Sequence, residues 1–125
     1  MTIFQCPHCG NQVYTLHDSG VPMICCGEPM KALVAGSSDG AQEKHVPAYQ
    51  VNGNSLDVTI GEVAHLMLAE HFIQWIAVEQ GDAVQFVPLH PDSAPKASFT
   101  IQASEPFTVY EYCTLHGLWK AEGRA

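Results

Sequence analysis

Four cysteines occur in two pairs near the start of this 125-residue chain. Cys6 and Cys9 lie in CPHCGN, and the adjacent Cys25 and Cys26 lie in ICCGEPM. Four thiolates are a common ligand set for a tetrahedral zinc or iron centre. Neighbouring side chains of a regular strand point to opposite faces, so both members of the adjacent pair can reach one ion only through a local backbone kink. A vicinal disulfide, or three ligands with a bystander, are the alternatives.

Histidines and the fifth cysteine form a second group of possible ligands. Cys113 and His116 in YCTLHG can converge on one ion through a turn that Gly117 permits. His65 and His71 would lie on different faces of a helix, or about 20 Å apart on a strand, so both can bind one ion only if the segment between them loops. Spacing alone leaves open that these are ordinary hydrogen-bonded histidines and a core thiol. The histidines after residue 40 are His45, His65, His71, His90 and His116.

Composition argues against several classes of function. Thirteen acidic residues against five basic ones give a formal net charge of −8, so we expect no nucleic-acid partner. The apolar runs are too short to span a membrane. The N-terminus lacks the basic region and apolar core of a signal peptide, so we expect a cytoplasmic protein. Five cysteines cannot all pair, and a reducing compartment favours metal binding over disulfides.

The turn-forming stretch AGSSDG at residues 35–40 divides the chain into predicted domains 1–36 and 37–125. The first holds four cysteines and little apolar mass, so we expect a metal ion to stabilise it. The second is predicted to be mainly β, an antiparallel sandwich, because strand-length runs rich in Val, Ile and aromatic residues alternate with turn formers. Those runs are residues 56–60, 72–79, 83–89, 98–103 and 107–113.

Two local features of the second domain give further expectations. Pro88 cannot donate a backbone hydrogen bond, so it should lie on an edge strand or at a strand end. Residues 61–72, GEVAHLMLAEHF, are the one segment whose pattern suggests a helix, and it would be short. Trp75 and Trp119 are interpreted as aromatic residues of the core or of the wall of a site.

Taken in order, these motifs resemble those of the desulfoferrodoxin family, the two-iron superoxide reductases. The matching stretches are CPHCGN, CCGEPM, EKHVP, HLMLAEHFIQWI and EYCTLHGLWK, which cover the chain from residue 6 to about 120. The resemblance implies a desulforedoxin-like module at residues 1–36, with iron or zinc held by the four cysteines. An immunoglobulin-like catalytic β-sandwich would follow at residues 37–125. VAHLM lacks the prolines that commonly flank its histidine in the family.

The resemblance also implies a catalytic iron centre in the second domain. Its sixth position would be open in the ferrous form, beside Glu43 and Lys44 of EKHVP. There superoxide would take one electron and leave as hydrogen peroxide. Lys44 would attract the anion and order a proton-delivering water, and Glu43 could occupy the sixth position after oxidation. The implied ligands are His45, His65, His71 and His116 in a plane, with Cys113 as the axial thiolate.

A homodimer and an electron donor such as rubredoxin are further implications of the resemblance. The four-cysteine centre would either relay electrons from that donor or stabilise the small module. Two rival functions also fit the metal ligands: a two-centre electron-transfer protein without substrate turnover, and a zinc-binding interaction module. The open sixth position favours substrate access, and an iron thiolate would be coloured where zinc is colourless.

Overall fold

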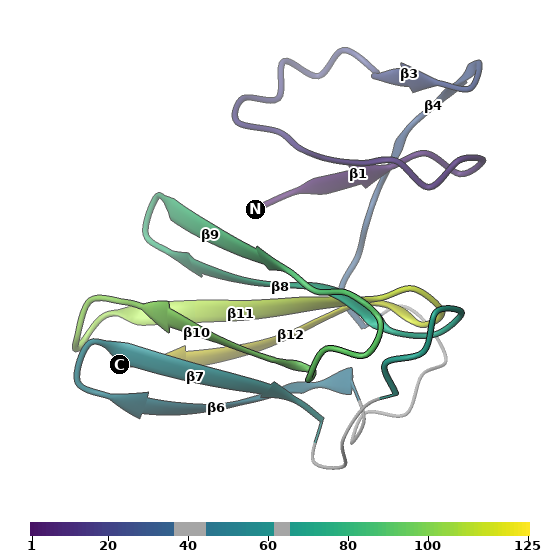
Figure 1. Cartoon of the computed structure of the whole chain (residues 1–125). Coiled ribbons are helices and arrows are strands. Elements are labelled where there is room, and N and C mark those ends of the chain that lie inside the picture. Colours follow the sequence, from purple (N-terminus) through teal and green to yellow (C-terminus); the bar gives the residue numbers. More distant parts are fainter. Residues whose placement is uncertain (37–44, 62–65) are drawn as a thin grey trace. The chain divides into compact units, whose positions relative to one another are not determined.

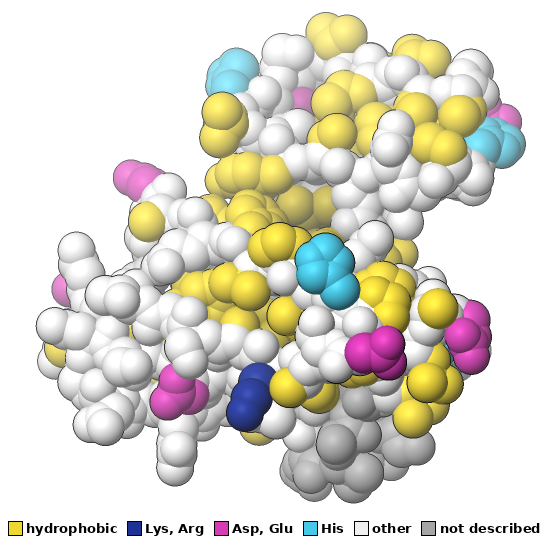
Figure 2. Space-filling model, viewed as in Figure 1, with side chains coloured by type: hydrophobic (Ala, Val, Ile, Leu, Met, Phe, Trp, Pro, Cys, Tyr) yellow, Lys and Arg dark blue, Asp and Glu magenta, His cyan; other side chains and the backbone are white. Residues whose placement is uncertain are grey.

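The computed structural model describes residues 1–36, 45–61 and 66–125, which form the strands drawn in Figure 1. The chain forms two compact units, Met1–Val34 and Ala35–Ala125. Among the described residues, no helix is long and apolar enough to cross a membrane. Dark-blue basic side chains are sparse on the face seen in Figure 2, in keeping with only five Lys and Arg in the sequence.

The first unit is built from short strands around a very small core. One antiparallel sheet has the order β2-β1-β5, and β3 and β4 form a separate hairpin. Only Ile3 and Cys6 are buried in this unit, which is described throughout. A core of that size cannot stabilise a chain of this length by itself. The strands are β1 (Ile3–Gln5), β2 (Gln12–Tyr14), β3 (Ile24–Cys25), β4 (Glu28–Pro29) and β5 (Lys31–Ala32).

The second unit is an antiparallel β-sandwich. Its sheets have the orders β10-β7-β6 and β12-β11-β8-β9. Seven strands in two sheets are typical of an immunoglobulin-like sandwich, so the predicted fold class is confirmed. The strands are β6 (Pro47–Asn52), β7 (Ser55–Ile60), β8 (Ile73–Gln80), β9 (Ala83–Pro88), β10 (Lys96–Thr100), β11 (Pro106–Cys113) and β12 (Gly117–Arg124).

Alternation of apolar and polar residues explains the core between the two sheets. In β7, Leu56, Val58 and Ile60 are buried while the residues between them are exposed. Val109 of β11 joins the same buried cluster from the other sheet. Full burial of one such aliphatic side chain contributes about 1.5–3 kcal/mol. Pro88 ends β9, the edge strand of its sheet, as predicted.

The helix predicted over residues 61–72 is wrong over its described part, residues 66–72. Leu68 and His71 form an isolated antiparallel bridge around a tight turn, with hydrogen bonds of 2.9 and 3.0 Å between their backbones. The chain therefore folds back on itself between these residues. Such a loop is what two histidine ligands six residues apart require. Residues 62–65 lie outside the described residues.

A β-bulge interrupts the pairing of β8 with β11. Tyr112 pairs with Trp75, but Cys113 pairs with Ile73, so Gln74 is the extra residue. A bulge bends the strand and re-aims the side chains next to it. This one lies where β11 ends and β8 begins, immediately beside the loops that carry His71 and His116.

Candidate metal centres

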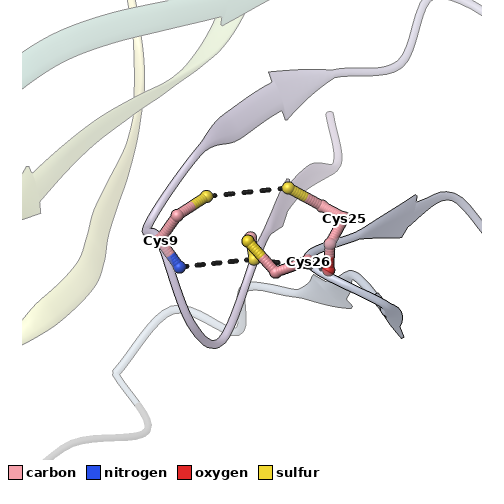
Figure 3. A group of neighbouring side chains, drawn as sticks. Cys9, Cys25 and Cys26 are labelled. Carbon is pink, nitrogen blue, oxygen red and sulfur yellow. Dashed lines mark hydrogen bonds between the residues drawn. The ribbon is translucent and has the colours of Figure 1, made fainter.

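The four N-terminal cysteines form the first cluster of possible ligands. Their sulfur atoms all lie within 4.8 Å of one another, and all are free thiols rather than a vicinal disulfide. Figure 3 shows the sulfurs of Cys9 and Cys25 facing each other, 3.6 Å apart. Asn11 Nδ2 donates to the Cys25 sulfur at 3.8 Å. The members of the cluster are Cys6, Cys9, Cys25 and Cys26.

A two-residue hairpin loop turns the adjacent pair of cysteines. Cys25 pairs with Glu28 across β3 and β4, which leaves Cys26 and Gly27 as the loop. Their φ angles of +52° and +78° are those of a type I′ turn. A positive φ is uncommon for a residue other than glycine. The backbone kink expected from the sequence is therefore present, and it lies at Cys26.

The protonation of the four thiols differs around the cluster. The backbone N–H of Cys9, with that of His8, donates to the Cys6 sulfur at 3.4 Å and lowers the pKa of Cys6 to about 6 despite desolvation. Contacts with the sulfurs of Cys9 and Cys6 raise the pKa of Cys26 to about 12. Crowded thiols cannot all ionise without a nearby cation. A donor set of four close sulfurs thus fits a bound metal ion, whose binding would release protons.

Three of the predicted histidine ligands form the second cluster. One ring nitrogen from each of His45, His71 and His116 lies within 4.8 Å of the others. The ring centroids are 4.7 Å apart for His45 and His116 and 5.3 Å apart for His71 and His116. Nitrogens bound to one ion at about 2.1 Å lie roughly 4 Å apart or less, so the three ring nitrogens are close to the spacing that one shared ion requires. Three more predicted site residues, Glu43, Lys44 and His65, lie outside the described residues.

Cys113 is fully buried at the end of β11. Burial raises the pKa of its thiol, and the charge of Glu111 does the same, whereas the backbone N–H groups of Leu115 and His116 bond the sulfur and lower its pKa. These two N–H groups are the donors that sequence reasoning could not assign. The Cys113 sulfur is not in the set of atoms within 4.8 Å of one another. It lies next to that set in the chain, three residues before His116.

Trp119 forms a wall of the histidine cluster. Its indole stacks on the His45 ring, with centroids 5.2 Å apart and an interplanar angle of 23°. Its Nε1 donates to the backbone oxygen of His116 at 3.2 Å. Trp119 is only 4% exposed, so it is a buried contact of both the His45 ring and the His116 backbone. This agrees with its interpretation as an aromatic residue of a site wall.

A pair of hydrogen bonds ties together the two loops that carry His71 and His116. The N–H of Thr114 donates to the backbone oxygen of Phe72 at 3.0 Å, and the N–H of Phe72 donates to the Thr114 hydroxyl at 3.2 Å. Gly117 follows with a φ of +83°, the left-handed conformation that glycine favours. The turn thereby brings Cys113 and His116 to the same end of the sandwich as His71.

Glu111 is a buried acid that sequence reasoning missed. Its side chain is 0% exposed, and neither carboxyl oxygen has a hydrogen-bond partner among the described residues. Desolvation raises its pKa to about 9. The alternation of Phe107, Val109 and Cys113 on the inward face of β11 was the available signal, because Glu111 occupies the inward position between Val109 and Cys113.

The fold and the two clusters define a β protein in which a four-cysteine module precedes a sandwich that carries a histidine cluster. The desulfoferrodoxin family matches residues 37–122, and the family of desulfoferrodoxin N-terminal domains matches residues 1–33. Desulfoferrodoxins of Nitratidesulfovibrio vulgaris and Clostridium acetobutylicum are 49% and 44% identical to this chain. The alignments cover 96% and 98% of this chain, and 94% and 96% of those proteins. The chain belongs to the desulfoferrodoxin family, which confirms the resemblance.

Solved structures agree with this assignment. The superoxide reductase from Treponema pallidum superposes with a TM-score of 0.76 at 31% identity, covering 96% of this chain and 97% of that chain. The superoxide reductase (1Fe-SOR) from Giardia intestinalis superposes with a TM-score of 0.59 at 27% identity, covering 66% of this chain and 99% of that chain.

Proposed function

We propose that this chain is a superoxide reductase, an oxidoreductase that takes superoxide as its substrate. Superoxide, one electron and two protons give one molecule of hydrogen peroxide. The observation that carries the proposal is the likeness to the superoxide reductase of Treponema pallidum over 96% of the chain. The histidine cluster lies at the end of the sandwich where the family motifs HLMLAEHFIQWI and EYCTLHGLWK meet.

The catalytic metal would be iron, which supplies the one electron that the reaction consumes. Neutral imidazoles hold such an ion without adding negative charge, so the site stays cationic toward an anion. Cys113 would add a thiolate ligand, its sulfur bonded by the backbone N–H groups of Leu115 and His116. The histidine ligands would be His45, His65, His71 and His116. The first centre, at Cys6, Cys9, Cys25 and Cys26, would hold iron or zinc.

Glu43 and Lys44 are the proposed residues beside the substrate position. The protein has a net charge of −8, which opposes the approach of an anion. A positive charge from Lys44 would offset that repulsion locally, and its ammonium group can order a water that delivers protons. Glu43 would supply a carboxylate that can ligate the oxidised metal.

An electron donor and a second copy of the chain complete the proposal. A rubredoxin-like protein would return the electron used in each turnover, and the first centre would relay it or stabilise the module. Exposed apolar side chains in the small first unit support a homodimer, since a partner could cover them. They are Leu16, Val21, Ile24 and Val34. Five free cysteines fit a reducing compartment, and we place the protein in the cytoplasm.

The decisive experiment mixes the reduced, iron-loaded protein with a pulse of superoxide without air. We expect a visible band to appear as the iron oxidises, with peroxide formed and no dioxygen released. Dioxygen release would indicate dismutation instead. An iron-loaded protein that leaves superoxide to decay at its spontaneous rate would favour the electron-transfer role, and a colourless zinc protein would favour the interaction module.

A matched pair of lysine variants tests the substrate side of the site. Lys44→Ala should slow the reaction with superoxide by about tenfold, because it removes the local charge that attracts the anion. Lys120→Ala is the control, since Lys120 lies on β12 and pairs with Glu122 at 3.5 Å. Equal rates in both variants would remove Lys44 from the mechanism.

A further inference from the structure

The β-bulge beside Cys113 leaves a buried backbone N–H that bonds to sulfur. Ile73 is 0% exposed, and its N–H donates to the thioether Sδ of Met67 at 3.4 Å. Beside Ile73, the hydrogen bond to the chain at the end of β11 runs from the N–H of Thr114 to the carbonyl oxygen of Phe72. Because adjacent residues of a strand direct their backbone groups to opposite sides, the Ile73 N–H points away from β11. Buried N–H groups normally bond to oxygen, and a thioether is a weak acceptor. This unusual pairing lies directly beside the proposed metal centre.

Met67 is also fixed at its backbone and at its side chain. Its carbonyl oxygen accepts a hydrogen bond from the N–H of Asp92 at 2.9 Å. Its side chain packs against the buried core of the sandwich. The bulge residue Gln74 is bound to the same neighbouring segment, because its carbonyl accepts the N–H of Leu89 at 2.9 Å. Met67 therefore connects three segments, which are the loop that carries His71, the start of β8 and the turn that follows β9.

We propose that Met67 is a positioning residue of the His–Cys centre. Its sulfur holds the bulge at the start of β8, and the bulge in turn sets where His71 and Cys113 lie relative to each other. The proposal deepens the superoxide reductase assignment and rests on it only for the iron readout below.

The physical reason is the register of the two strands. Regular pairing beyond Tyr112 and Trp75 would place Gln74, not Ile73, opposite Cys113. A one-residue slip moves each side chain to the other face of a sheet. Ile73 would then leave the core, and the loop containing His71 would be pulled along β11. An acceptor for the Ile73 N–H favours the bulged register over the regular one.

The rival interpretation is that Met67 only fills a gap in the core, as methionine often does. Leucine has nearly the same volume but no acceptor, whereas glutamine has nearly the same length and an amide oxygen that can accept. Met67→Leu and Met67→Gln therefore separate volume from hydrogen bonding. Met30→Leu, at a half-buried methionine of the first unit, is the control for a general loss of methionine.

The first readout is amide hydrogen exchange of Ile73, measured by NMR in the zinc-loaded full chain. We expect exchange at least about tenfold faster in Met67→Leu and close to the unmodified rate in Met67→Gln. The second readout is the visible band and reduction potential of the iron-loaded protein. Both should shift in Met67→Leu, return in Met67→Gln and stay unchanged in Met30→Leu.

Unchanged Ile73 exchange and an unchanged band in Met67→Leu would overturn the proposal and make Met67 a core filler. If Met67→Leu does not fold, Met67→Gln still decides, because loss of Ile73 protection in a folded glutamine variant also contradicts the idea. If the unmodified protein shows no iron–thiolate band, the proposed function fails, but the exchange comparison in the zinc form still tests the role of Met67.

Discussion

The two units of this chain build a metal site in opposite ways. In the first, the ligands come from two short loops, Cys9 and Cys26 are exposed, and Ile3 and Cys6 are the only buried residues. In the second, the clustered His45, His71 and His116 come from segments far apart in sequence, and His45 and the nearby Cys113 are buried. A metal ion bound by the first unit would therefore stabilise the fold itself, whereas in the second unit the packed sandwich already brings the histidines together.

Metal removal should give the largest difference in stability between the two units. A chelator should unfold residues 1–34 and leave the sandwich folded, because structural metal binding in small modules is worth about 10–16 kcal/mol. Amide NMR spectra of the full chain should then lose dispersion only for the first unit, and proteases should cut there first. A first unit that stays ordered without metal would show that its packing suffices.

Serine variants of one cysteine from each unit come next. Cys9→Ser should remove the first centre and disorder its unit, while the second centre keeps its visible band. Cys113→Ser should abolish that band and lower superoxide turnover by more than about 100-fold, while the first unit stays folded. Absorption spectra and turnover of both variants test this. A Cys113→Ser protein with full turnover would show that Cys113 is a spare core thiol.

Glu111 gives a pH dependence confined to the second unit. Its pKa is raised from 4.5 to about 9, so it is protonated when folded and ionised when unfolded between those values. Stability should therefore fall as the pH rises through this window, by about 3 kcal/mol between pH 4.5 and pH 7. Glu111→Gln should flatten that slope in urea unfolding of the metal-free chain followed by circular dichroism.

The control for this experiment is Glu122→Gln, which changes an exposed acid on β12 and should keep the slope of the unmodified protein. Identical slopes for Glu111→Gln and the unmodified chain would show that the folded pKa of Glu111 is not raised.

Glycine variants should have the smallest effects and sharpen the contrast between packing and turns. A Cβ on Gly123 would lie 2.6 Å from Tyr49 Cζ and 2.8 Å from Phe107 Cζ, so Gly123→Ala should cost about 1–3 kcal/mol. A Cβ on Gly20 meets nothing within 4 Å, but its φ is +88°, so Gly20→Ala should cost about 1 kcal/mol. Denaturant unfolding of each variant measures both, and equal costs would contradict this ranking.

The sandwich strands were predictable where alternation is clean. Leu56, Val58 and Ile60 define β7 almost to the residue. The alternation in β12 is broken, because the adjacent Leu118 and Trp119 are both buried, and this strand was not predicted. The helix prediction failed because hydrogen bonds across to Thr114 outweigh local periodicity.

Local motifs of the candidate site were predictable, and tertiary partners were not. Spacing indicated the four-cysteine cluster and the kink at Cys26. Nothing in the sequence pairs Met67 with the Ile73 N–H, or names the donors to the Cys113 sulfur. Those contacts depend on how a β-bulge and two loops meet in the folded chain. No periodic pattern of residues in the sequence predicts such a meeting.

The stacking of Trp119 on His45 has a practical consequence for following metal loading. The chain has two tryptophans, and both lie in the second unit. The Trp119 indole lies 5.2 Å from the His45 ring, so iron bound at that ring would be close enough to quench the indole fluorescence. A fall in tryptophan emission during an iron titration would therefore report occupancy of the histidine centre without any added dye.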